Sequence, residues 1–202
     1  KETYLFSVPL TTVSNVGLKG EEGATLKIGN AANVLLIHDG DIETNIKFTN
    51  LIFDFNGAQQ TDGADREDRC GIRLHNKTNL SFTRCTFKNA HSGAGLVLRA
   101  CANVFLINNV WDHNDEYYSG VSSFICDHSY MEECTDVSII GSVYDNCSDV
   151  GTAFDNCQRV SVSATQYIEC HVAAFTWWNR DDTMLYPESL SVMGCDIVCV
   201  EN

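Results

Sequence analysis

Four ionisable side chains stand at the ends of short segments in which apolar and polar residues alternate. They are His38, His75, Arg99 and Asp155, and Ile125 interrupts the series before Asp155. A β-elimination needs a base to take the proton α to a uronate carboxylate and a cation to stabilise the resulting charge. Arg99 or His75 could serve such a reaction, and the 24-residue repeat described below makes these two residues neighbours. The alternative is that these are ordinary polar residues on the outside of a strand.

A second set of side chains follows a repeated large apolar position. Its members, in chain order, are Asp54, Lys88, Asp112, Asp145, Ile168 and Val198. If the repeats stack as neighbouring strands, Asp112 and Asp145 lie about 5 Å apart, and Asp54 and Asp112 about 10 Å apart. Such separations suit the carboxyl pair of a glycosidase or a bound Ca²⁺ ion. The alternative is a solvated row in which Lys88 neutralises its acidic neighbours.

Aromatic side chains outside the repeated positions form a third group. It comprises Tyr117, Tyr118, Trp177, Trp178 and Tyr186, and the Trp177-Trp178 pair is followed by Asn179-Arg180-Asp181-Asp182. Flat rings stack on sugar faces as well as on protein neighbours. We predict that Trp177, Trp178, Tyr117, Tyr118 and Arg180 bind substrate. The alternative is that one tryptophan plugs the core and the other packs against another subunit.

A sequence repeat positions these groups. Residues 71–89 can be laid over residues 95–113 without a gap, 24 positions later. A template that begins at Asn45 recurs from Asn79, Asn103, Asp136, Arg159 and Ser189. A period of this length is typical of stacked units that cannot bury their apolar faces alone.

Three apolar positions are filled in every copy of the template. The first column is Ile46, Leu80, Val104, Val137, Val160 and Leu190; the second is Phe48, Phe82, Leu106, Ile139, Val162 and Val192; the third is Phe53, Phe87, Trp111, Tyr144, Tyr167 and Ile197. Successive side chains of a strand point to opposite faces, and neighbouring strands lie about 4.8 Å apart. The pattern therefore predicts an all-β, single-stranded parallel coil of about six to seven turns, in one domain over residues 1–202.

A shorter segment precedes each template copy and is predicted to form a second stack of strands. These segments are Ile72–His75, Leu96–Arg99, Ser122–Ile125, Thr152–Asp155 and Ala173–Thr176. The long insertions are Phe55–Cys70, His113–Gly120 and Asn179–Glu188, next to these segments, and Asp127–Glu133, which is assigned to the other turn. Loops on one side of a rigid scaffold commonly carry function, so we expect them to wall a groove.

The ten cysteines include no Cys-x-x-Cys pair, which argues against a zinc site. The repeat groups seven of them, with Cys101, Cys134 and Cys157 in one column, Cys85 and Cys195 in a second, and Cys147 and Cys170 in a third. Recurrence at equivalent places predicts reduced thiols that serve as packing residues.

The charge balance limits the possible partners. A formal net charge of −14 argues against a nucleic-acid or anionic-membrane partner, since both attract clustered Lys and Arg. No apolar run approaches the roughly 20 residues of a spanning helix, so membrane insertion is not expected. No motif predicts a metal site or a cofactor, and Ca²⁺ stays an option for the carboxylate row alone.

The segment Asn79-Leu-Ser-Phe-Thr-Arg-Cys-Thr-Phe-Lys-Asn89 resembles the generic coil of the right-handed parallel β-helix in the pectate-lyase-like superfamily. That fold is also the body of many bacteriophage tail spikes, and the resemblance covers about residues 14–200. The chain departs from the family in lacking the polygalacturonase-type Gly-His-Gly motif, and its one Asp-Asp doublet, Asp181-Asp182, lies in a predicted loop. The resemblance is therefore specific for the fold and weaker for the activity.

The resemblance implies a carbohydrate-active domain of the tail-spike depolymerase type, extracellular or on a virion surface and assembled as a homotrimer. It would bind a bacterial surface polysaccharide and cleave it by hydrolysis or β-elimination, with His75, Arg99, Asp112 and Asp155 as catalytic candidates. The alternative is a non-catalytic receptor-binding or structural shaft. Neither end of the sequence shows a capping segment for the exposed sheet edges, so we expect a fragment of a longer chain or one member of an assembly.

Overall fold

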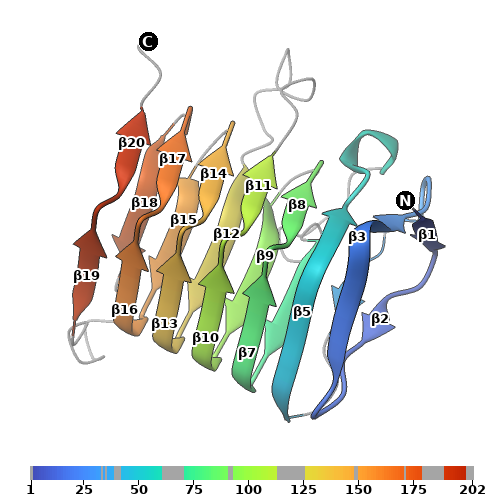
Figure 1. Cartoon of the computed structure of the whole chain (residues 1–202), viewed down its shortest axis with the longest axis horizontal. Helices are drawn as coiled ribbons and strands as arrows, with labels where there is room; N and C mark the ends of the chain where they lie inside the picture. The colour runs from blue at the N-terminus through green and yellow to red at the C-terminus, as the bar shows by residue number, and fades with distance from the viewer. Residues whose placement is uncertain are drawn as a thin grey trace.

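The computed structural model describes residues 2–32, 34, 36–38, 42–60, 71–90, 93–112, 126–147, 150–170, 172–178 and 189–198. Over these residues the chain is all-β, apart from a short 3-10 helix at Gly57–Gln59. The strands belong to two sheets of parallel strands, stacked along the longest axis of the molecule (Figure 1). The prediction of an all-β chain built from parallel strands is confirmed.

The smaller sheet has seven strands in the order β18-β15-β12-β9-β6-β4-β2. They are β2 (Leu10–Thr11), β4 (Ile37–His38), β6 (Ile72–His75), β9 (Gly93–Arg99), β12 (Cys126–Glu132), β15 (Val150–Asp155) and β18 (Ala173–Trp178). Neighbours in this order are about one strand spacing, or 4.8 Å, apart.

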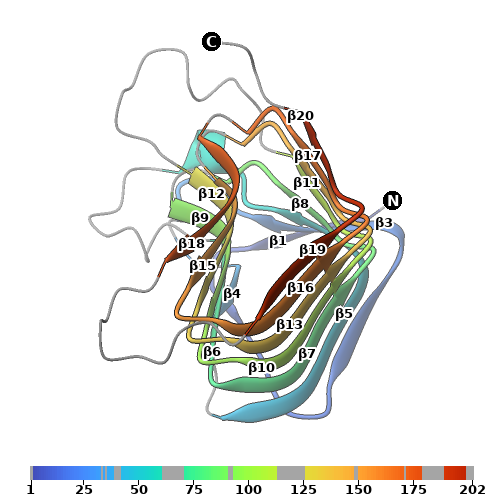
Figure 2. The same ribbon diagram turned by 90° about the vertical axis from the view of Figure 1, so that its left-hand side faces the viewer.

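The larger sheet has thirteen strands in two halves. The first half holds β7 (Lys77–Thr83), β10 (Ala102–Ile107), β13 (Thr135–Ile140), β16 (Gln158–Ser163) and β19 (Leu190–Met193). The second half holds β8 (Thr86–Lys88), β11 (Val110–Asp112), β14 (Val143–Asp145), β17 (Gln166–Ile168) and β20 (Asp196–Val198). The long strands β3 (Gly17–Ile28) and β5 (Glu43–Asp54) run through both halves, and β1 (Thr3–Phe6) pairs with β3. Each coil of the chain thus contributes to the smaller sheet and then to both halves of the larger one (Figure 2).

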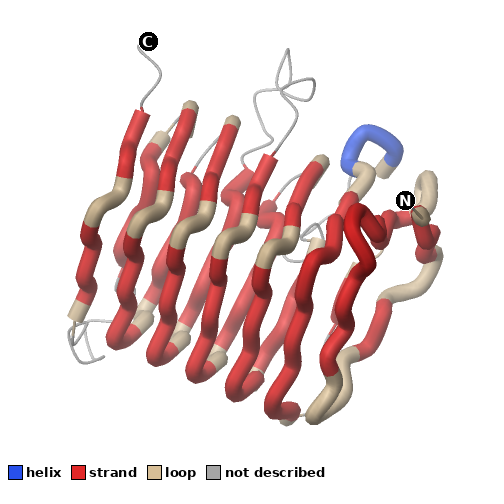
Figure 3. The backbone as a smooth tube through the Cα atoms, in the orientation of Figure 1, coloured by secondary structure: helices blue, strands red, loops and turns tan. Residues whose placement is uncertain are grey.

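The bends between the two sheets are very short (Figure 3). A residue in the left-handed region follows β6, β9, β12 and β15, namely Asn76, Ala100, Glu133 and Asn156, with φ between 48° and 55°. Asparagine adopts this conformation readily, whereas Ala100 and Glu133 do so at a cost of about 1–2 kcal/mol each. Packing of the strands on either side must offset that cost.

The three predicted columns run in continuous register and build the core. Their last members, Leu190, Val192 and Ile197, are exposed. In the third column, stacked rings run from Phe53 through Phe87, Trp111 and Tyr144 to Tyr167, with successive centroids 5.1, 4.7, 4.3 and 4.8 Å apart. All five side chains are buried. Burial of large rings in offset contact is among the strongest stabilising terms available to a small core.

The cysteine columns are also confirmed, and one of them contains a buried ion pair. The thiols of Cys101, Cys134 and Cys157 each donate to a carbonyl oxygen of the preceding coil, at 3.3–3.6 Å. Lys77 and Glu43 continue the same column, with Nζ 3.4 Å from Oε2 and with Lys77 fully buried. The seven cysteines of the three predicted columns are free thiols.

One predicted strand is misplaced. We expected a strand at 122–125 and an insertion at 127–133, but β12 spans Cys126–Glu132, and residues 122–125 lie outside the described residues. The pairs Ser129–Leu96 and Met131–Leu98 fix the register of β12 against β9. The apolar run Phe124-Ile125 matched the alternation of the other copies better than the polar sequence of β12 did, and strand pairing in the folded chain outweighs that local pattern.

The ring column can be tested by truncation. We expect Trp111→Ala to lower the free energy of unfolding by about 3–5 kcal/mol, because it opens a cavity between two stacked rings. Phe105→Ala is the matched control, since Phe105 lies on the same turn of chain but is 40% exposed; it should cost less than about 1 kcal/mol. Urea unfolding followed by circular dichroism measures the free energy of unfolding of both variants. Equal losses would contradict the stabilising role of the stacked rings.

The stability should also fall at alkaline pH through the buried thiols. Burial raises the pKa of Cys85 from 9.0 to about 11. Below pH 9 both states keep this proton, but between about pH 9 and 11 the unfolded state ionises first, which costs up to about 2 kcal/mol of stability. Urea unfolding of wild type and Cys85→Ala at pH 8 to 11, under reducing conditions, should show a shallower alkaline loss for the variant. The same loss in both proteins would contradict this role of Cys85.

Candidate functional site

A row of five residues, four of them ionisable, crosses the smaller sheet at the ends of its strands. The Cα partners along this row are His75, Arg99, Glu132, Asp155 and Trp178, one from each of β6, β9, β12, β15 and β18. Parallel strands in register place these Cα atoms about 4.8 Å apart. The predicted proximity of His75 and Arg99 is confirmed, and Glu132 separates Arg99 from Asp155. We call these five residues the smaller-sheet row.

His38 does not belong to this row. Ile37 pairs with Ile72, and the ring Nε2 of His38 lies 2.9 Å from Nη2 of Arg73. His38 therefore lies beside Arg73, two residues before His75. The sequence placed it wrongly because β4 is only two residues long and gives little alternation from which to read a register.

The acidic members of the row are held by neighbours. Arg99 Nε lies 2.5 Å from Oε2 of Glu132, and the two side chains are 30% and 26% exposed. Asp155 is fully buried and accepts a hydrogen bond of 3.0 Å from the hydroxyl group of Tyr130. His75 is half-buried. The partly exposed side chains of the row are therefore the His75 imidazole, whose Nε2 atom is buried, and the paired Arg99 guanidinium and Glu132 carboxylate.

Asp112 lies apart from the other three predicted catalytic residues. It is an exposed residue of β11, in the second half of the larger sheet, where it pairs with Lys88 and Asp145. Sequence reasoning placed the Asp54-to-Val198 row correctly, but this row and the smaller-sheet row belong to different sheets. Asp112 ends a strand of the larger sheet, so the structure does not bring it into the smaller-sheet row.

Asp54, the first acidic residue of that other row, is a structural group. Its Oδ2 lies 3.4 Å from Nζ of Lys27 and 3.9 Å from Nζ of Lys88, and its Oδ1 accepts a hydrogen bond of 2.9 Å from the Asn89 side chain. The carboxylate is buried among these partners. Within the described part of the chain, no three His, Cys, Asp or Glu side chains lie together as a metal site would require.

The residues predicted to bind substrate fall into three groups. Trp177 packs against the core beside Phe154, with ring centroids 5.6 Å apart, so it faces away from the row. The Cα of Trp178 pairs with that of Asp155 at the end of the row. Tyr117, Tyr118 and Arg180 lie outside the described residues.

Three residues near the row escaped the sequence analysis. Glu132 was hidden by the misplaced strand, and Tyr130 and Arg73 lie two residues before the row on their strands. Tyr130 packs on Ala94 and Val97 on the outer face of the smaller sheet. The positions of Glu132 and Tyr130 follow from the pairing of β12 with β9. No local sequence pattern predicts this pairing.

Comparison with known proteins gives a likeness of fold. No family model matches the chain. No curated protein matches it either. Among solved structures, a candidate glycosyl hydrolase from Parabacteroides merdae matches with a TM-score of 0.59 and 13% identity, over 96% of this chain and 77% of that one. Two structures of PfbA, a surface adhesin of Streptococcus pneumoniae, match with TM-scores of 0.51 and 0.52 and identities of 11% and 12%, over 97% and 96% of this chain and 87% and 69% of theirs.

No helix among the described residues is long and apolar enough to cross a bilayer.

The Tyr130–Asp155 contact can be tested directly. We expect Tyr130→Phe to lower the free energy of unfolding by about 1–3 kcal/mol, because it removes a donor from a fully buried carboxyl group. Tyr4→Phe is the matched control, since the Tyr4 hydroxyl donates to Glu2 in an exposed pair. It should change stability by less than about 0.5 kcal/mol. Equal effects in urea unfolding would show that Asp155 does not depend on Tyr130.

Proposed function

We propose that this chain is a right-handed parallel β-helix that binds an acidic extracellular glycan along the smaller-sheet row and cleaves it by β-elimination. The observation that carries the proposal is the pairing of His75 with Arg99 on adjacent strands, both partly accessible. An imidazole can take the proton α to a uronate carboxylate, and the adjacent guanidinium stabilises the charge that develops. A guanidinium also binds a carboxylate in a directional manner.

The other residues of the row have supporting roles in this proposal. Glu132 orients Arg99 through the 2.5 Å contact, and buried Asp155 positions Tyr130 through its hydrogen bond. Hydrolysis fits less well, because a glycosidase needs two accessible carboxyl groups, and here one is paired and the other is fully buried. Tyr117 and Tyr118 precede β12 in the chain, and Arg180 follows β18, so we keep these residues and Trp178 as substrate-binding candidates.

We include in the proposal a surface location, on a cell or a virion, and a homotrimer of the tail-spike kind. The likeness to a glycosyl hydrolase candidate and to a bacterial surface adhesin supports an extracellular, carbohydrate-related role.

A second candidate function is glycan binding without cleavage. The closed Arg99–Glu132 pair and the complete burial of Asp155 favour it, since both are features of a rigid structural face. The same row would then recognise the glycan through His75 and Arg99. The likeness to PfbA supports this alternative.

Activity on a panel of acidic bacterial polysaccharides tests the proposal. We expect an increase in the absorbance of unsaturated uronates, and a loss of about 100-fold or more in kcat/KM for His75→Ala and Arg99→Ala. Asp112→Asn is the matched control, because it changes an exposed carboxylate of the other sheet; it should stay within about twofold. Circular dichroism confirms that each variant is folded.

The outcomes separate the two candidates. New reducing ends without unsaturated uronates would show that the reaction is hydrolysis and not β-elimination. Saturable binding that His75→Ala and Arg99→Ala abolish, without product, would establish the binding function instead. Activity that survives both variants, or that is lost in Asp112→Asn, would overturn the assignment to this row.

A further inference from the structure

Two cysteines lie side by side at one bend of the stack. Cys147 follows β14, Cys170 follows β17, and both are reduced thiols in the structure. β14 pairs with β17 before the two cysteines, and β15 pairs with β18 after them, with the same offset between partners. Their Cα atoms are therefore about one strand spacing, 4.8 Å, apart. That separation lies within the range of about 4.4–6.8 Å that a disulfide requires.

The two side chains also differ in a way that suits thiol chemistry. Cys147 is fully buried, whereas Cys170 is 8% exposed. A hydrogen bond from Cys147 lowers the pKa of Cys170, against the opposing effect of burial. The thiolate is the attacking form in thiol–disulfide exchange. Cys170 is therefore the thiol that reacts with a reagent in solution, and Cys147 is the thiol placed to react second.

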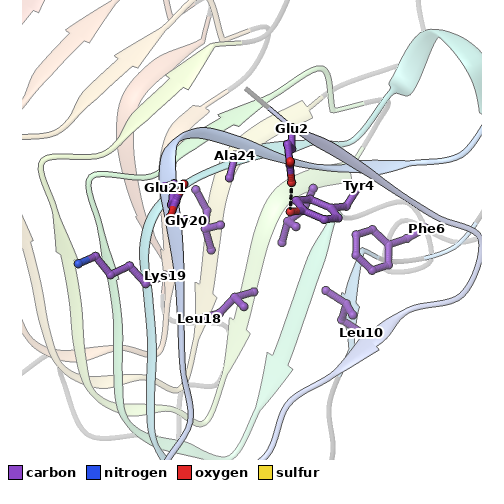
Figure 4. A pocket seen from close by; sticks show the side chains of 11 residues that line it. Glu2, Tyr4, Phe6, Leu10, Leu18, Lys19, Gly20, Glu21 and Ala24 are labelled. Atoms are coloured by element: carbon purple, nitrogen blue, oxygen red, sulfur yellow. Dashed lines mark hydrogen bonds between the residues drawn. The ribbon is translucent and has the colours of Figure 1, made fainter.

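Access separates this pair from the longest thiol column. Cys101, Cys134 and Cys157 also lie in register, and a hydrogen bond from Cys134 lowers the pKa of Cys101. Each of these three residues, however, is at most 1% exposed. The apolar pocket of about 710 Å³ beside β1 and β3 does not lead to them, because no cysteine lines it (Figure 4). An oxidant in solution therefore reaches Cys170 before any thiol of that column.

The remaining thiol column contains no adjacent pair. Cys195 is more exposed than Cys170, and Cys85 is the other cysteine of its column. The strands β11, β14 and β17 lie between β8, which follows Cys85, and β20, which follows Cys195. These two thiols are too far apart to be joined.

We infer that Cys147 and Cys170 are a disulfide-forming pair, which a small-molecule disulfide such as oxidised glutathione closes in the folded protein. The Cys170 thiolate attacks one sulfur atom of the oxidant and releases the first glutathione thiolate. The Cys147 thiolate then attacks the Cys170 sulfur atom of the mixed disulfide and releases the second. The pair loses two protons and two electrons, and the oxidant becomes two molecules of glutathione.

The cross-link joins the bends that lead into β15 and β18. These strands end at Asp155 and Trp178, the last two members of the smaller-sheet row. A disulfide restricts the unfolded chain more than the folded one, so closing the loop of residues 147–170 raises the thermal midpoint. The inference rests on strand register and thiol accessibility, and it holds whether the row cleaves a glycan, binds one or does neither.

Oxidation of the folded protein tests the pair. The wild-type protein is incubated with oxidised glutathione in native buffer, alkylated, and digested with trypsin and endoproteinase Asp-N. We expect mass spectrometry to find residues 145–148 joined to residues 160–180, two peptides that contain one cysteine each. We also expect the thermal midpoint to rise by about 5 °C or more, and dithiothreitol to reverse both effects.

Two variants give the controls. Cys147→Ser removes the second thiol, so Cys170 should keep glutathione as a mixed disulfide and the thermal midpoint should not rise. Cys157→Ala is the matched control, since it removes a buried thiol of the other column. It should leave the cross-link and the rise in midpoint unchanged. Circular dichroism before oxidation shows that each variant is folded, and the wild-type peptide map decides the question without them.

Three results would overturn the inference. The first is an oxidised wild-type protein without the link between Cys147 and Cys170. The second is a link within the column of Cys101, Cys134 and Cys157 in its place, because access would then not select the pair. The third is a link that fails to raise the thermal midpoint, because it would then distort the folded strands.

Discussion

The register between coils is the constraint on which the rest of the structure depends. Each strand pairs with its successor without slippage from β7 to β19, so every inward side chain lies on the equivalent side chain of the next coil. The stack from Phe53 to Tyr167 is the most demanding case, because rings of different size must keep contact at 4.3–5.1 Å. A shift of one residue anywhere would turn the whole core pattern outward.

The same register governs the polar groups of the interior. Lys77 and Glu43 are buried at one bend, and their mutual contact compensates part of the cost of removing two charges from water. The thiols above them are satisfied by carbonyl oxygens that each preceding coil presents at the same place. A buried polar group is tolerated here because the repeat supplies its partner along with its position.

On the outside, the register brings residues that are far apart in the sequence into one linear site. His75 and Arg99 come before Glu132 and Asp155 along the smaller-sheet row, so its basic residues are followed by its acidic ones and then by Trp178. This arrangement follows from the continuity of the strand pairing from β6 to β18.

The sequence by itself determined the parts of the protein that repeat. The three core columns, the thiol columns, the row of Asp112 and Asp145, and the proximity of His75 to Arg99 could all be predicted, because a fixed period makes equivalent residues neighbours. Only the tertiary structure decided which residues form the strand of the smaller sheet between β9 and β15. It placed β12 (Cys126–Glu132) between β9 and β15, and thereby placed Glu132 beside Arg99.

The tertiary structure also decided how the site is divided. Asp112 and Asp155 were both predicted to be catalytic, yet one is exposed on the larger sheet and the other is fully buried on the smaller one. Likewise, Trp177 and Trp178 are adjacent in the chain, but Trp177 faces the core. The physical reason is that alternation tells which residues share a face, whereas only the packing of one sheet against the other tells which face meets water.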